Sequence, residues 1–253
     1  MNADSMIIAE STAVWMLLVF DVIIGIVLLF GAKSQPFPTP AKRFGKLILV
    51  LTGLLLLGQS APNPTSLEAH LGIISVIGAF GLVSGIHHML NTRREVLVAP
   101  MSGFLFCVGV AGLITKTWDE LTQFEHWAGF LALVVLAGGQ TWLVFRGLLI
   151  GRLPLAWSQA GMVALHRGQL HGSHGAIECF EKAWDGDEEH LNPMAYSALY
   201  KINLFLDDQQ QAEHWNELFL ESGGKNAVAK EWLEAIDQCL SAMGYSPTPM
   251  SEE

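Results

Sequence analysis

The chain has 253 residues, of which 51% are hydrophobic and 15% are charged. It is too apolar for an ordinary water-soluble domain, and its length allows one or two domains. Its net charge of −10 argues against a protein that binds nucleic acid, because phosphate repels an acidic chain.

The acidic residues are concentrated in the second part of the chain. Residues 1–150 carry eight acidic and eight basic residues, whereas residues 151–253 carry sixteen acidic and six basic residues. This break predicts a domain over 1–150, a second domain over 151–245 and a flexible tail over 246–253.

The first domain contains five apolar runs, each close to the roughly 20 residues that cross a bilayer. They cover residues 11–31, 44–59, 67–89, 98–115 and 124–149. Lys and Arg residues follow the first, third and fifth runs, whereas the N-terminal tail and the second connection have none. Because basic residues stay on the cytoplasmic side, we expect a multi-pass inner-membrane protein whose N-terminus is outside and whose C-terminal domain is cytoplasmic.

Asp21 lies near the middle of the first run, where an ionised carboxylate is costly unless it is paired or protonated. Thr52 and Gln140 are possible neutral partners on other spans. Two interpretations stay open: a protonated side chain that hydrogen-bonds a neighbouring helix, and the functional carboxylate of a small ion-coupled transporter. In the third run, Ser75, Gly78 and Gly85 share one helical face and predict a helix-packing seam.

The third and fifth runs begin alike, with TSLEAHLG (Thr65–Gly72) and TQFEHWAG (Thr122–Gly129). Thr-x-x-Glu is a capping box, which explains Glu68 and Glu125 without any ligand. The functional alternative uses His70 and His126, one near the outer end of each span. Two imidazoles from separate helices are able to hold a b-type haem. Together with Glu68 and Glu125 they offer a set of ligands for a divalent metal.

The second domain shows helical periodicity over residues 155–167, 175–184, 194–206, 209–221 and 227–243, with short polar breaks between. Antiparallel helix pairs are therefore predicted. Over about residues 154–243 the chain resembles the tetratricopeptide repeat (TPR) family. The matching residues are Trp157, Gly161, the Gly168-Gln169 turn, Ala176, Phe180 and Ala183. The resemblance implies stacked helix pairs that bind a partner protein.

We therefore expect an all-α protein: a membrane helix bundle of about five spans followed by a cytoplasmic TPR-like domain. Its expected role is a scaffold or assembly subunit of a membrane complex, in contact with lipid and with membrane or cytoplasmic proteins. One alternative is a haem- or metal-binding redox protein that uses His70 and His126, and another is a transporter that uses Asp21. No nucleophile–base pair or phosphate-binding loop is evident in the sequence, which favours a protein that is not an enzyme.

Overall fold

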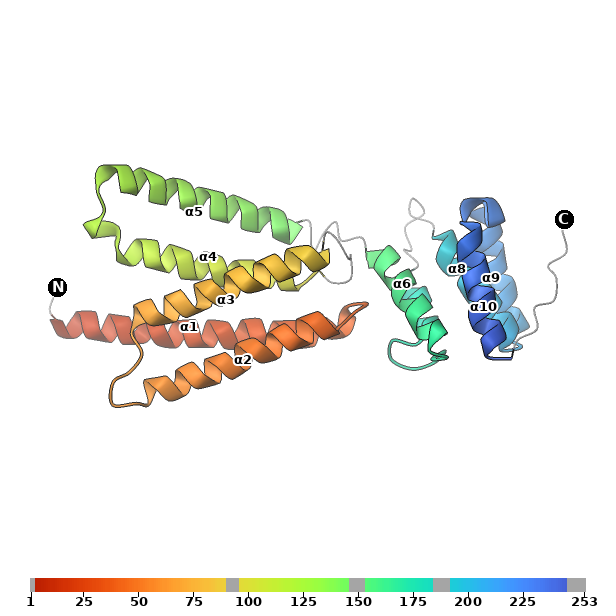
Figure 1. The fold of residues 1–253 in the computed structure, drawn as a ribbon, viewed down its shortest axis with the longest axis horizontal. Helices are drawn as coiled ribbons and strands as arrows, with labels where there is room; N and C mark the ends of the chain where they lie inside the picture. The colour runs from red at the N-terminus through yellow and green to blue at the C-terminus, as the bar shows by residue number, and fades with distance from the viewer. Residues whose placement is uncertain (1–2, 90–95, 146–152, 184–191, 245–253) are drawn as a thin grey trace. The chain divides into compact units, whose positions relative to one another are not determined.

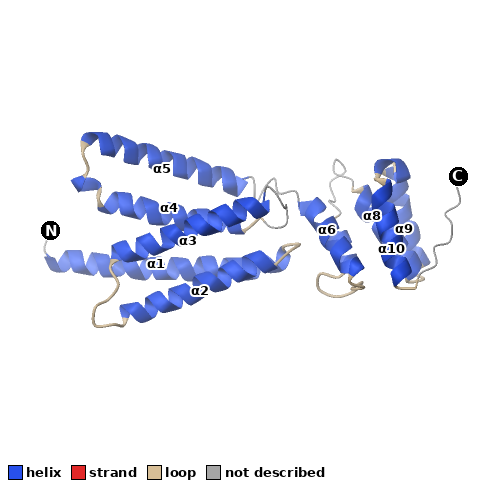
Figure 2. Ribbon diagram, viewed as in Figure 1, coloured by secondary structure: helices blue, strands red, loops and turns tan. Residues whose placement is uncertain are grey.

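The structure is a computed structural model that describes residues 3–89, 96–145, 153–183 and 192–244. Within these residues the chain is helical and contains no strand, which confirms the predicted all-α class (Figure 2). The chain divides into two compact units, Met1–Gly151 and Arg152–Glu253. The predicted flexible tail over 246–253 lies outside the described residues.

The described part of the first unit is built from five long helices that run alternately in opposite directions (Figure 1). They are α1 (Ala3–Gly31), α2 (Thr39–Gln59), α3 (Leu67–His87), α4 (Val98–Lys116) and α5 (Gln123–Val144). Two 3₁₀ turns, η1 (Ala32–Ser34) and η3 (Trp118–Glu120), follow α1 and precede α5.

Four described stretches are long and apolar enough to cross a membrane. They are Glu10–Ser34, Leu67–His87, Val98–Lys116 and Gln123–Val144, and they correspond to the first, third, fourth and fifth predicted spans. The predicted span 44–59 is not among them, because α2 carries Lys42, Arg43 and Lys46 in its first two turns.

Helices α3 and α4 approach closely along the small residues of α3. A Cβ atom added at Gly78 would lie 2.4 Å from the backbone nitrogen of Phe106, and one at Gly85 would lie 2.3 Å from that of Ala99. Neither position has room for a side chain, so the two backbones pack directly against each other. The predicted packing seam is confirmed, and α4 is its partner.

Two apolar clusters join α1 and α2 to their neighbours. The cluster near the start of α1 contains Val14, Leu18 and Leu55, with Leu51, Leu67 and Ile73 packed against it. The cluster near the end of α1 contains Ile24, Leu28, Ala32, Ala41, Phe44, Ile48, Leu97, Val98, Met101 and Leu105. Helix α5 packs on α4 and exposes large apolar side chains such as Trp127, Phe130 and Val134. An exposed apolar surface of this kind fits a lipid environment.

The described part of the second unit consists of two helical hairpins and a final helix. Helices α6 (Leu153–His166) and α7 (Ala176–Lys182) form the first hairpin, and α8 (Pro193–Phe205) and α9 (Gln209–Glu221) form the second. Helix α10 (Lys230–Ala242) follows a 3₁₀ turn, η5 (Gly224–Ala227). All five predicted helices are present, and α10 begins three residues later than predicted because η5 occupies Gly224–Ala227.

Local sequence determines where the helices of the second hairpin begin and end. The side chains of Asn192 and Asp208 cap α8 and α9 by accepting hydrogen bonds from the backbone N–H groups of the first turns. Gly223, with a φ of 101°, ends α9 in the left-handed conformation that glycine favours. Helix α8 packs against α7, α9 and α10. The side chains of Phe180, Tyr196, Leu199 and Ile202 are fully buried in this core.

Candidate functional site

The two similar helix starts are capped differently. At α5 the predicted capping box is confirmed: the backbone N–H of Thr122 donates to Glu125 Oε2 at 2.7 Å, and the N–H of Glu125 donates to Thr122 Oγ1 at 3.5 Å. At α3 the prediction is wrong, because Ser66 is the N-cap and accepts from the N–H of Ala69 at 3.2 Å. Thr65 is therefore outside the helix by one residue.

Glu68 has an ionic partner instead. Lys116, the last residue of α4, forms ion pairs with Glu68 on α3, at 3.2 Å, and with Glu10 on α1. All three side chains are about one third to one half exposed, so each pair adds little stability by itself. The two ion pairs of Lys116 nevertheless show that the first turn of α3 and the start of the apolar part of α1 lie at the same end of the bundle.

The two predicted histidine ligands have different surroundings. His70 is fully buried, and among the described residues neither of its ring nitrogens has a hydrogen-bond partner. His126 is held within its own segment: Nε2 lies 2.7 Å from the carbonyl oxygen of Trp118, and its ring lies 4.7 Å from the Trp118 ring. Helix α4 packs against both α3 and α5, the helices that carry the two histidines.

The predicted ligand set does not form a group in the described chain. Within residues 3–89, 96–145, 153–183 and 192–244, no three His, Cys, Asp or Glu side chains are arranged to hold a metal ion. Glu68 pairs with Lys116, and Glu125 closes the capping box. These contacts account for both carboxylates and for one nitrogen of His126, whereas the backbone of Ser66 is the polar group that acts on the buried His70 ring.

Asp21 and Thr52 form a polar layer between the two apolar clusters of the bundle. Asp21 lies three residues after Leu18 of one cluster and three before Ile24 of the other, and Thr52 holds the matching position on α2. Both side chains are buried, and Asp21 Oδ1 has no partner among the described residues. The Thr52 hydroxyl donates to the carbonyl of Ile48 at 2.8 Å, and its oxygen keeps a lone pair for a hydrogen bond from another donor.

Gln140, the other expected partner of Asp21, is engaged with α4. Its Nε2 donates to the carbonyl of Pro100 at 2.9 Å, and a Cβ atom at Gly103 would overlap its Oε1. Gly103 therefore lets the amide approach the α4 backbone. This bond connects the Gln140 amide to the main chain in the first turn of α4. Gln140 thus joins α5 to α4.

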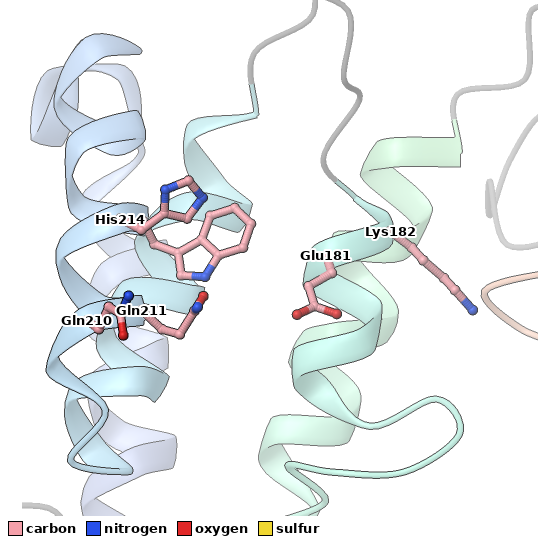
Figure 3. Close-up of a pocket in the computed structure, with 6 residues that line it drawn as sticks. Glu181, Lys182, Gln210, Gln211 and His214 are labelled. Carbon is pink, nitrogen blue, oxygen red and sulfur yellow. The ribbon is translucent and has the colours of Figure 1, made fainter.

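The second unit carries an open pocket of about 690 Å³ between α7 and α9 (Figure 3). Its lining residues are Glu181, Lys182, Gln210, Gln211, His214 and Trp215. In Figure 3 the Glu181 carboxylate extends from α7 toward the α9 side, where Gln211 and His214 lie. The side chains of Glu181, Gln210 and Gln211 have no hydrogen-bond partner in the described chain and are available to a ligand.

Lys182 points away from the α9 side in Figure 3. Its ammonium lies 2.5 Å from Glu178 Oε1 and 4.9 Å from the centre of the Trp157 ring. The Lys182 ammonium and the His174 N–H hold the pKa of Glu178 below its ordinary value. The pocket is therefore lined by the Glu181 carboxylate from α7 and by two amides, an imidazole and an indole from α9. These groups suit a polar or basic peptide segment.

The opposite face of the hairpin stack is covered by α10, which packs on α6 and α8. Ile236 and Leu240 of α10 are fully buried there. Trp232 Nε1 donates to the carbonyl of Met194 at 3.0 Å. Because α10 covers this face, the α7–α9 pocket lies on the face of the stack that α10 leaves open.

Sequence reasoning missed the α7–α9 pocket. Glu181 and Gln211 are thirty positions apart, and only the hairpin stacking brings α7 and α9 together. The available signal was the run Gln209-Gln210-Gln211 directly before the buried Ala212 and Trp215. Amide side chains on the exposed face of an amphipathic helix indicate a surface that forms hydrogen bonds.

No protein family, curated protein or solved structure matches this chain.

Proposed function

We propose that this chain is a five-span integral membrane protein whose second unit is a TPR-like adaptor on the cytoplasmic side. The adaptor holds a partner protein at the membrane, so the chain acts as a scaffold or assembly subunit of a membrane complex. The observation that carries this proposal is that one chain contains both a lipid-compatible bundle and a hairpin stack with an open polar pocket between α7 and α9.

The ion pairs of Lys116 support the assignment of α2 as a span in addition to the four candidate spans named above. Glu10 on α1 and Glu68 on α3 reach the same ammonium, so α2 must return the chain from the far end of α1 to the end where α1 begins. Helix α2 has 21 residues, about 30 Å of helix, and packs along α1. Its three basic residues then lie at the membrane surface, where long side chains reach the headgroups.

The distribution of charge supports the orientation. Lys33, Lys42, Arg43 and Lys46 surround the connection from α1 to α2, and this end of the described bundle has no acidic residue. The opposite end carries Glu10, Glu68, Asp119, Glu120 and Glu125, with Lys116 as its basic residue. Basic residues favour the cytoplasmic side, so the α1–α2 connection faces the cytoplasm. Protease added to intact cells should then leave the second unit intact, and its digestion from outside would refute this orientation.

Five residues of the TPR-like pattern support the adaptor assignment by their packing. Trp157, Ala176, Phe180 and Ala183 are buried, and a Cβ atom at Gly161 would lie 2.7 Å from the Phe180 ring. These are the small and aromatic positions through which such hairpins interlock. The pocket chemistry and the excess of acidic residues in residues 151–253 favour a partner segment that is basic and rich in hydrogen-bonding groups.

Site-specific photo-crosslinking tests the adaptor in the full chain in cell membranes. A photoreactive residue at Gln211, in the pocket, should give a defined adduct, and one at Ser241, which is exposed on α10 and lines neither this pocket nor the one between α6 and α10, should not. Glu181→Lys should reduce the Gln211 adduct severalfold because it repels a basic segment, whereas Glu231→Lys on α10 should leave it unchanged. The same adducts at both positions, or an adduct insensitive to Glu181→Lys, would contradict the proposal.

The ion-coupled transporter remains a second candidate because of the buried Asp21 carboxyl and its unpartnered Oδ1. Asp21→Asn separates the two functions, because asparagine keeps the shape and removes the titrating proton. A scaffold should keep its Gln211 adduct in this variant. A transporter reconstituted in vesicles should lose proton flux, and flux unchanged by Asp21→Asn would eliminate this candidate.

A further inference from the structure

A pocket of about 300 Å³ opens between α2 and α3, near the start of α4. Helix α2 contributes Thr39, Arg43 and Leu47, α3 contributes Phe80 and Ser84, and His88 follows directly after α3. Each set is spaced by four residues, so it forms one row along its helix. Both rows are polar at the end of the bundle that carries the α1–α2 connection, and both become apolar one or two turns deeper.

The two rows continue as apolar surface toward the middle of the bundle. Val50 and Leu54 on α2 are 63% and 59% exposed, and Val76 and Phe80 on α3 are 70% and 66% exposed. In the described chain α2 packs mainly on α1, and α3 packs mainly on α4. The apolar surfaces beyond the pocket are therefore left open to hydrocarbon.

The polar end of the pocket is positively charged. Arg43 lines it, and Lys42 and Lys46 flank it on the same helix. Within the part of the chain that the structure describes, no acidic side chain pairs with any of the three. A guanidinium with five donors beside the hydroxyls of Thr39 and Ser84 matches the oxygen atoms of a phosphate group.

We propose that this pocket binds the headgroup phosphate of an anionic phospholipid, whose acyl chains lie along the apolar rows of α2 and α3. A change from cationic to apolar lining over two helical turns matches the change from headgroup to acyl chain in one lipid leaflet. Cationic pockets between spans on the cytoplasmic side recognise such headgroups. The inference rests on the proposed membrane orientation, which places this end of the bundle at the anionic cytoplasmic leaflet.

The test measures lipid binding to the purified full chain in mild detergent by native mass spectrometry. The probes are phosphatidylglycerol, phosphatidylcholine with the same acyl chains, and inorganic phosphate. We expect phosphatidylglycerol to remain bound and phosphatidylcholine to be lost. Arg43→Gln should weaken phosphatidylglycerol binding by about tenfold or more, the usual effect of losing a charged hydrogen bond. Lys33→Gln removes the same charge at this end of the bundle, away from the pocket, and should change binding by less than about twofold.

A second variant separates shape from charge. Ser84→Leu fills the pocket and keeps every cation, and it should also weaken phosphatidylglycerol binding. Equal losses in Arg43→Gln and Lys33→Gln would overturn the proposal, because they indicate a general charge effect. Equal binding of the two lipids would also overturn it, and displacement of the lipid by inorganic phosphate would identify a soluble ligand instead. Extraction of the wild-type chain from membranes by alkaline carbonate would refute the membrane assignment itself, whereas a retained chain without lipid selectivity would refute only this site.

Discussion

The stability of the second unit should depend on how Lys201 is neutralised. This side chain is 5% exposed, its ammonium lies 2.7 Å from both carboxylate oxygens of Asp237, and the carbonyl of Leu233 lies at 3.4 Å. Asp237→Ala leaves the ammonium buried with one long polar contact. Removing one partner of a fully buried pair costs about 3–5 kcal/mol. Because the Asp237 side chain is 38% exposed, water can enter the vacated space, and we expect a loss of about 2 kcal/mol.

The opposite change should be much milder. Lys201→Met keeps an aliphatic side chain of similar length and removes the charge, and Asp237 can turn to water. We expect the free energy of unfolding of this variant to lie within about 1 kcal/mol of the wild type. The double variant Lys201→Met/Asp237→Ala should therefore be more stable than Asp237→Ala alone, by about 1–2 kcal/mol.

Cys179 provides the assay in the full chain. Its side chain is fully buried in the second unit, so it reacts with a thiol reagent only when that unit opens. With the other two cysteines replaced by alanine, the extent of labelling is measured against urea concentration in mild detergent. A loss of 2 kcal/mol should lower the urea midpoint by about 1 M. The reasoning is refuted if Lys201→Met lowers the midpoint as much as Asp237→Ala, or if the two effects add in the double variant.

Three further outcomes follow from local packing and chemistry. Gly78→Leu should destabilise the α3–α4 pair by about 2–3 kcal/mol, measured by thermal unfolding in detergent, whereas Gly72→Leu, where an added Cβ meets nothing within 4 Å, should not. Ser66→Ala should lower the free energy of unfolding of the bundle by about 1 kcal/mol, because it removes the N-cap of α3. Thr65→Ala should leave this free energy unchanged or raise it, because the buried Thr65 hydroxyl has no partner among the described residues. Burial raises the pKa of Cys179 from 9.0 to about 11. The neutral thiol therefore favours the folded state, and this contribution is fully present below pH 9 and is lost as the pH rises toward 11. The urea midpoint should fall over the same pH range.

Hydropathy and periodicity were sufficient to locate the helices, because both depend on neighbours within one element. The cap of α3 shows where such reasoning stops. Thr65 and Ser66 both carry hydroxyls, and which one accepts the hydrogen bond depends on backbone angles that their order in the chain does not reveal. The same limit explains the misassigned box at Glu68, whose partner is Lys116 on another helix.

The sequence also could not show which side chains of neighbouring helices lie opposite each other. Thr52 lies level with Asp21, while Gln140, an equally plausible partner by depth, bonds to Pro100 on α4. Depth in a membrane can be read from one helix, but the neighbour a side chain meets depends on how helices rotate against each other. The α7–α9 pocket was hidden for the same reason, because it requires two hairpins to stack.

The contact of Lys116 with Glu10 and Glu68 also constrains the order of biogenesis. In the proposed topology, both carboxylates reach the outer side of the membrane before Lys116, the residue that neutralises them, has been synthesised. The ion pairs that connect α1 and α3 at this end therefore form only after synthesis has passed residue 116.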